Sequence, residues 1–374
     1  MKNLLLLILL LPSIVCAQKS RVRDLDIEVA VMRTGALNAI TDVPGVQVGH
    51  STLIEGKNIR TGVTAILAHG ENLFLQKVPA AIYVGNGFGK LAGSTQVQEL
   101  GNIETPIILT NTLSVGTAIS ATVEYMLGLE DMENVGSVNA VVGETNDGGL
   151  NDIRGMHVKK EHVWEAIKNA KSGEVEEGNV GAGTGTVAFG WKGGIGTSSR
   201  VLPKSAGGYT VGVIVQSNFG GVLQVNGVPI DKEMNRHILR NAYESADGSC
   251  MIVVMTDAPV NERNLERMAK RAMMGLAKTG GIASNGSGDY VIAASTAPEL
   301  RIAHNSKESL NPPASFLRND NMTLRFMATI EATEEAILNS LFMAEDMTGR
   351  GGRTVKAMPV SEVMEIYKKY QPEK

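Results

Sequence analysis

The stretch ADGSCMIVVMTD, residues 246–257, decides how the rest of the chain is interpreted. A flexible Gly-Ser pair stands directly before an apolar run that is typical of a buried strand. Taken alone, this is most simply a loop that enters a strand. It also has a chemical interpretation. A serine hydroxyl can attack the carbonyl of the residue before it when the backbone is held in place, and Gly248 puts no side chain in the way.

A cut between Gly248 and Ser249 would make Ser249 the N-terminal residue of a new chain. Its α-amine, with an ordinary pKa of about 8, can then act as general base for its own hydroxyl. No histidine is needed, and the six histidines of the chain are scattered. They form none of the spacings typical of zinc sites, and no G-x-S-x-G elbow occurs, so we predict neither a metal site nor a hydrolase elbow.

Cys250 follows the proposed nucleophile directly, and a thiol is intrinsically the stronger nucleophile. Successive residues of a strand face opposite sides, so the side chains of Ser249 and Cys250 should point apart. We therefore expect Cys250 to be a small buried residue.

Outward from this stretch, short apolar runs bounded by glycine and asparagine predict strands at residues 63–67, 80–84, 106–109, 139–142, 211–216, 251–255 and 290–294. Apolar spacing predicts helices at residues 115–127, 161–170, 232–243, 261–278 and 331–345. The helix at 261–278 has the clearest ends, because Asn261 can cap it and Gly280 follows it. The alternation of strands and helices predicts an α/β protein with helix-covered sheets and an irregular loop at 304–321.

The glycine-rich run GAGTGT at residues 181–186 resembles a dinucleotide fingerprint only loosely. A strand-like segment at 187–189 follows it where that motif requires a helix, so nucleotide binding is not expected. The net charge of −4 and the lack of a basic cluster also argue against nucleic acid and anionic membranes as partners. Glycine is abundant, at 42 of 374 residues, and its clusters between apolar runs indicate turns and close backbone approaches.

The first 17 residues have the organisation of a secretory signal peptide. Lys2 precedes an apolar run at 4–11, which is too short to span a bilayer, and small residues end the segment before Gln18. A lipid anchor at Cys16 and a buried N-terminal helix are the weaker alternatives. We expect residues 18–374 to form a single catalytic domain in the periplasm or outside the cell, without a membrane partner. Cys250 is then the one remaining cysteine, which excludes a disulfide within the chain.

A series of motifs in chain order extends the pattern around Gly248 and Ser249. They are LNAITDVPGVQVGH (37–50), GNGFGK (85–90), TPIILTNT (105–112), GETNDGGLND (143–152), KGGIGTSSR (192–200), QSNFG (216–220), DGS (247–249) and NGSGD (285–289). With these motifs the chain resembles the L-aminopeptidase/D-esterase-amidases and β-peptidyl aminopeptidases, a family of self-processing serine hydrolases, from about residue 35 almost to the C-terminus. The resemblance implies a four-layer α/β/β/α sandwich of the N-terminal-nucleophile type. It also implies cleavage into an α chain (18–248) and a β chain (249–374) that assemble as a homo-oligomer.

The same resemblance implies roles for individual residues. Ser249 matches the nucleophile, and Asn218 matches an asparagine that donates to the oxyanion. Ser287 and Asp289 match a Ser-x-acid pair that binds and orients the Ser249 amine or hydroxyl, although some members have glutamate in place of the aspartate. Glu144 matches an acidic residue that receives the free amino group of the substrate.

The predicted function is that of a serine aminopeptidase without metal or cofactor. It would release N-terminal residues from short peptides, amides or esters through an acyl-enzyme on Ser249. Asn146 stands where some members have a tyrosine near the oxyanion, which leaves open the second oxyanion donor and the preference among L-, D- and β-amino acids. Two alternatives remain: an acyltransferase of related fold, although those use a threonine nucleophile, and a non-catalytic periplasmic binding protein.

Overall fold

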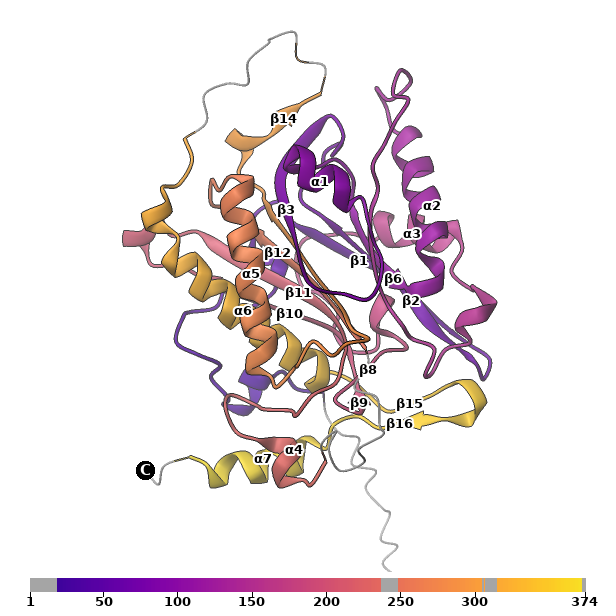
Figure 1. The fold of residues 1–374 in the computed structure, drawn as a ribbon, viewed down its shortest axis with the longest axis vertical. Coiled ribbons are helices and arrows are strands. Elements are labelled where there is room, and N and C mark those ends of the chain that lie inside the picture. Colours follow the sequence, from indigo (N-terminus) through magenta and orange to yellow (C-terminus); the bar gives the residue numbers. More distant parts are fainter. Residues whose placement is uncertain (1–18, 237–247, 305, 307–314, 372–374) are drawn as a thin grey trace, which may run out of the picture.

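Two β-sheets lie face to face, and helices cover both outer surfaces (Figure 1). The computed structural model of the chain describes residues 19–236, 248–304, 306 and 315–371. Its layers follow the order α/β/β/α, which confirms the predicted architecture. The signal-peptide prediction for residues 1–17 lies outside the described residues.

The larger sheet has the strand order β10-β11-β12-β13-β3-β14, and β5 pairs with β3 outside that path. Its strands are β3 (Gln76–Gly87), β5 (Asn102–Ile103), β10 (Gly194–Val201), β11 (Thr210–Asn218), β12 (Ser249–Thr256), β13 (Gly288–Ser295) and β14 (Ile302–Ala303). The β12–β13 pair is parallel, whereas β12 runs antiparallel to β11, and β13 to β3. The strand that Ser249 begins therefore lies inside the sheet, with a partner on each side.

The smaller sheet has the order β1-β2-β6-β7-β4. It contains β1 (Gln47–Glu55), β2 (Ile59–Leu67), β4 (Leu91–Ala92), β6 (Ile107–Asn111) and β7 (Val141–Thr145). Two short ribbons complete the strands: β8 (Val187–Ala188) with β9 (Trp191–Lys192), and β15 (Met347–Thr348) with β16 (Thr354–Val355).

Helices α5 (Glu262–Lys278) and α6 (Thr323–Phe342) pack on the larger sheet, and α2 (Val115–Leu127) and α3 (Lys160–Lys168) pack on the smaller one (Figure 1). The remaining helices are α1 (Ser94–Leu100), α4 (Ile230–Glu233) and α7 (Val360–Lys369). Within the described residues, no helix combines the length and the apolar character that crossing a membrane requires.

The apolar core is divided by the sheets into layers, because both faces of each sheet are covered. Along β12, Met251 and Val253 face the smaller sheet, and Ile252 and Val254 face α5 and α6. A third cluster fills the space between the smaller sheet and α2 and α3. Burial on both faces explains why this strand is continuously apolar and does not alternate.

Each of the seven predicted strands is present, and α2 and α5 begin and end close to the predicted residues. Asn261 caps α5 by accepting the Asn264 N–H, as expected. The prediction of a helix at 232–243 is wrong for residues 234–236. Helix α4 ends at Glu233, and Asn235 has a φ of 52°, which is a left-handed conformation. Residues 237–243 lie outside the described part. Helix α6 starts at Thr323, earlier than the predicted residue 331.

The irregular loop predicted at 304–321 is described only in part. Residues 315–318 have no regular structure, and a short 3-10 helix follows at Asn319–Asn321. The segment after the glycine-rich run 181–186 forms the strand β8, as predicted, and not a helix.

Candidate active site

Strand register brings the distant motifs together at one end of the larger sheet. Asn218, the last residue of β11, pairs with Ser249, the first residue of β12. Ser249 in turn pairs with Gly288, the first residue of β13, and Gly288 pairs with Gly87 at the end of β3. Four motifs that are far apart in the sequence thus lie side by side.

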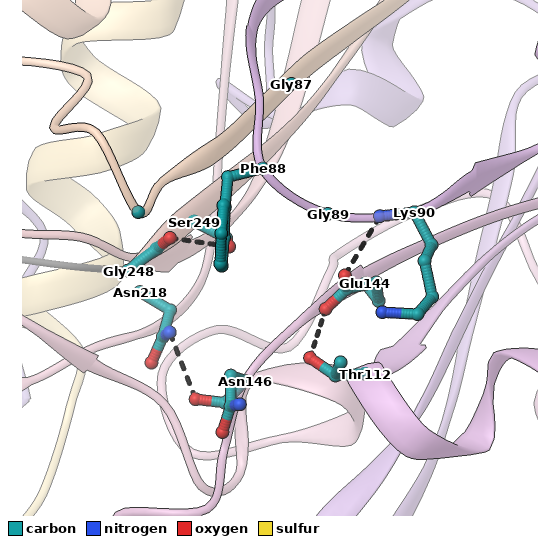
Figure 2. A pocket seen from close by; sticks show the side chains of 11 residues that line it. Gly87, Phe88, Gly89, Lys90, Thr112, Glu144, Asn146, Asn218, Gly248 and Ser249 are labelled. Carbon is teal, nitrogen blue, oxygen red and sulfur yellow. Dashed lines mark hydrogen bonds between the residues drawn. The ribbon is translucent and has the colours of Figure 1, made fainter.

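A cavity of about 500 Å³ opens at this end of the sheet (Figure 2). Its lining consists of Gly87, Phe88, Gly89, Lys90, Thr112, Glu144, Asn146, Asn218, Gly248, Ser249 and Gly286. It therefore brings together Ser249, Gly248, Asn218, Glu144 and Asn146. Ser287 and Asp289 are not among the lining residues, but they follow the lining residue Gly286 closely in the chain.

The Ser249 hydroxyl lies against the carbonyl of the residue before it. Its Oγ donates to the Gly248 carbonyl oxygen at 2.6 Å. The Gly288 N–H reaches both the Gly248 carbonyl oxygen and the Ser249 Oγ, at 3.2 Å in each case. Only 5% of the Ser249 surface is exposed, so the hydroxyl and this peptide bond are held together at the edge of the cavity.

Gly248 occupies a position with no room for a side chain. A Cβ there would overlap the Asn218 carbonyl oxygen and lie 2.6 Å from the Phe219 Cα. Both obstacles belong to the backbone, which cannot move aside as the end of a side chain can. Glycine at this position is therefore a steric requirement of the site.

The amide of Asn218 has a fixed orientation. Its Oδ1 accepts the Val187 N–H at 2.9 Å, and its Nδ2 donates to the Asn146 carbonyl oxygen at 3.1 Å. An amide nitrogen carries two N–H donors, so a second N–H remains on the nitrogen beside the cavity. Asn218 thus lines the cavity together with Ser249 and has an N–H that is not engaged by another group.

Asn146 lines the cavity, and its side chain takes part in a local turn. Its side-chain oxygen accepts the Gly148 N–H at 2.9 Å and so closes a local turn. Its backbone carbonyl holds the Asn218 amide. Asn146 therefore contacts Asn218 through its backbone carbonyl and not through its side chain.

Glu144 reaches the cavity from the smaller sheet, near the end of β7. Its surface is 2% exposed, and both carboxylate oxygens are held: Oε1 accepts the Lys90 N–H at 3.0 Å, and Oε2 accepts the Thr112 hydroxyl. Figure 2 shows these two contacts across the cavity from Ser249. Lys90 and Thr112 lie inside the quoted motifs GNGFGK and TPIILTNT, yet sequence reasoning assigned them no role, because only the tertiary fold brings them to Glu144.

Ser287 and Asp289 form a pair behind the Gly288–Ser249 contact. The Ser287 hydroxyl donates to the Asp289 Oδ1 at 2.9 Å. Burial raises the pKa of Asp289 to about 6, although the Ser287 hydrogen bond acts in the opposite direction. The other oxygen, Oδ2, has no hydrogen-bond partner among the described residues. A buried carboxylate oxygen without a partner is costly, so this atom has the capacity to bind a cation or a proton.

Cys250 faces away from the cavity, as the alternation of a strand predicts. It is fully buried in the apolar cluster between the larger sheet and α5 and α6. Burial and the neighbouring Asp289 carboxylate raise the pKa of its thiol well above the ordinary value. The thiolate form, which is the reactive one, is therefore suppressed, and the expectation of a buried Cys250 is confirmed.

Within the described ranges, no group of three or more histidine, cysteine, aspartate or glutamate side chains is arranged to hold a metal ion. The cavity instead combines a hydroxyl at a strand start, an oriented amide and an opposing carboxylate. A hydroxyl and an oriented amide at one cavity are typical of hydrolases that use a nucleophile.

Comparison with known proteins agrees with this class. The chain belongs to Peptidase family S58, whose profile matches residues 38–355. It is 41% identical, over 97% of its length and 96% of the relative's, to the beta-peptidyl aminopeptidase BapA of Sphingosinicella microcystinivorans. Its structure resembles a Burkholderia sp. beta-aminopeptidase, with a TM-score of 0.87 and 38% identity over 94% of this chain and 100% of the other.

A further structural relative is the L-aminopeptidase D-Ala-esterase/amidase of Ochrobactrum anthropi, described as a prototype of the serine aminopeptidases and a variant of the Ntn hydrolase fold. The TM-score is 0.86, with 34% identity over 94% of this chain and 98% of that one. The family resemblance and the fold class predicted from the sequence are therefore confirmed. The protein is an aminopeptidase, a hydrolase of the S58 family.

Proposed function

We propose that this aminopeptidase processes itself between Gly248 and Ser249 and then uses Ser249 as its nucleophile. The observation that carries the proposal is the contact of the Ser249 hydroxyl with the Gly248 carbonyl, under the Gly288 N–H. In the first step Oγ would bond to the Gly248 carbonyl carbon, and the peptide C–N bond would break as its nitrogen takes the hydroxyl proton. Water then hydrolyses the ester, leaving a carboxylate on Gly248 and a free amine on Ser249.

The same atoms would serve the peptidase reaction. The new amine takes the proton of the Ser249 hydroxyl as the oxygen attacks the substrate carbonyl. The free N–H of Asn218 supports the developing oxyanion, and the proton passes to the leaving amine. Asp289, whose Oδ2 has no partner among the described residues while the peptide bond is intact, then stabilises the Ser249 ammonium.

Substrate recognition would depend on the free amino group. Glu144 is held rigidly by Lys90 and Thr112 and faces the cavity, so it can bind an ammonium by a charge-assisted hydrogen bond. Relatives named beta-peptidyl aminopeptidase and beta-aminopeptidase support β-amino acyl groups as substrates. We extend the proposal to a metal-independent reaction, export through the N-terminal 17 residues and assembly of the cleaved chains as a homo-oligomer.

The direct test is a denaturing gel with N-terminal sequencing of the purified protein, followed by hydrolysis of β-alanyl-p-nitroanilide. We expect a new chain that begins at Ser249 and an active product. Ser249→Ala should stay as one chain and lose at least about a thousandfold in kcat/KM. Cys250→Ala, which truncates the neighbouring buried side chain, is the matched control and should still be cleaved. An active wild-type protein that stays uncut at Ser249 would refute self-processing.

A further inference from the structure

The two charged side chains of the cavity lining have opposite signs and lie together. Among the eleven lining residues, these are Lys90 and Glu144. Strand β4 pairs antiparallel with β7 in the register Leu91 to Gly143, which sets Lys90 opposite Glu144. Directly opposite residues of such a pair point to the same face. Figure 2 shows the Lys90 side chain bending toward the carboxylate, on the far side of the cavity from Ser249.

The Lys90 ammonium is not needed to hold Glu144 in place. The carboxylate is already fixed by the Lys90 backbone N–H and by the Thr112 hydroxyl. The Lys90 side chain is exposed, and its ammonium takes part in none of the hydrogen bonds or ion pairs among the described residues. One end of the cavity therefore presents an anion for an amine and, next to it, a cation that is free to bind an anion.

We infer that Lys90 binds a carboxylate on the same carbon that carries the amine of the substrate. An amine and a carboxylate on one carbon are the head group of an α-amino acid, which matches a carboxylate and an ammonium side by side. The acyl bond at Ser249 must then be formed by the side-chain carboxyl of that amino acid. With a β-amino acyl group, the substrate class is an isoaspartyl residue at the N-terminus of a peptide or amide.

This inference rests on the proposed function and adds the identity of the acyl group. Ser249 Oγ would bond to the side-chain carbonyl carbon, the C–N bond would break, and the leaving amine would take the proton. Water would then hydrolyse the ester and release free aspartate. Without Lys90, the substrate carboxylate would lie near Glu144, and the like charges would repel each other.

The test compares two p-nitroanilides that differ in charge alone. Isoaspartyl-p-nitroanilide carries the carboxylate, and isoasparaginyl-p-nitroanilide carries a neutral carboxamide of the same shape. For the processed wild-type enzyme we expect kcat/KM to be about tenfold higher for the isoaspartyl compound. The ratio within one variant is the readout, so a general loss of activity cancels.

Lys90→Met should lower this ratio to one or below, and Lys90→Arg should restore it above one. The matched control is Lys57→Met, which removes the same charge from the exposed turn between β1 and β2, outside the cavity lining, and should keep the wild-type ratio. A wild-type ratio of one or less, or an equal ratio in Lys90→Met, overturns the inference. Hydrolysis of β-alanyl-p-nitroanilide separates the two proposals. If the wild-type enzyme cleaves this compound but the isoaspartyl ratio is one or less, only the role of Lys90 is refuted. If the enzyme does not cleave it, the proposed function is refuted and the inference with it.

Discussion

Two groups of charged residues, one at the contact of β10 with α6 and one around the cavity, differ in how completely their charges are paired. At the β10–α6 contact, Arg200 donates to Glu331 Oε2 at 3.1 Å and to Glu335 Oε2 at 2.7 Å, and its other nitrogen donates to Ser198 and to the Ser199 carbonyl. In the site, the buried Asp289 Oδ2 has no hydrogen-bond partner among the described residues. The Lys90 side chain is exposed, and its ammonium forms no ion pair within the same part of the chain. Charged groups that are fully paired fix the packing of a helix on a sheet. Charged groups without a partner in the protein are available to bind a ligand.

The polar group around Arg200 also explains a strand that is not recognisable from its sequence. Strand β10 reads GIGTSSRV, with few apolar side chains, yet seven of its eight residues are buried. Gly196 lets α6 approach so closely that a Cβ would overlap the Ala336 carbonyl oxygen. The polar side chains of β10 are hydrogen-bonded within the protein, so they need no water: Thr197 donates to the Val213 carbonyl, Ser198 to Asn38, Ser199 to Asp42, and Arg200 to α6.

The largest expected effect comes from breaking the fully paired cluster. Arg200→Met leaves Glu331 buried without a cation and leaves Glu335 with Arg23 alone. We expect the free energy of unfolding to fall by about 3–5 kcal/mol in urea titrations. Lys356→Met breaks an exposed pair with Asp346 and should cost less than about 1 kcal/mol. Equal losses in both variants would contradict the distinction.

The second prediction concerns the packing around the peptide bond that we expect to be cut. Gly248→Ala places a Cβ against the Asn218 carbonyl and should slow the appearance of the chain that begins at Ser249 by about 100-fold, or about 2.7 kcal/mol of activation free energy. A time course on denaturing gels measures it. Gly136→Ala, at an exposed position where a Cβ would meet nothing, is the control for the added methyl group. Cleavage of the Gly248→Ala chain at the wild-type rate would show that the close approach is not required.

The third prediction uses the raised pKa of Asp289, about 6 in the chain with an intact peptide bond. Because the folded pKa exceeds the unfolded one, the folded chain binds more protons between pH 4 and 6, and its stability falls as pH rises through that range. In the uncleaved Ser249→Ala background, Asp289→Asn should raise the free energy of unfolding by about 2 kcal/mol at pH 7.5 and have little effect at pH 4. Urea titrations at both pH values measure this difference.

The control for that measurement is Asp320→Asn, which changes a side chain that is 81% exposed. It should leave the free energy of unfolding nearly constant at both pH values. A gain from Asp289→Asn of the same size at pH 4 and pH 7.5 would exclude ionisation as its cause.

The smallest effect is expected at the carboxylate for the substrate amine. Glu144→Gln keeps the hydrogen bonds possible but removes the charge, so kcat/KM for β-alanyl-p-nitroanilide should fall by about tenfold, mostly through KM. Glu124→Gln, on an exposed face of α2, should change neither constant. A loss confined to kcat would point to a role for Glu144 in the chemical step instead of binding.

The sequence by itself determined a large part of this protein. Apolar runs located the seven strands because strands buried on both faces need continuous apolar side chains. Cap residues located α5, and the ordered motifs together with the Gly-Ser pair before β12 identified Ser249 as the candidate nucleophile. Alternation along that strand was sufficient to place Cys250 in the core.

Only the tertiary structure decided which distant residues meet. The register of β11, β12, β13 and β3 aligns Asn218, Ser249, Gly288 and Gly87, and no local pattern in the chain encodes that register. Glu144 reaches the same cavity from the other sheet, with Lys90 held opposite it by β4. Local preferences fix elements within a few residues, whereas a site depends on long-range pairing and on which faces are buried together, and these arise only when the whole chain packs.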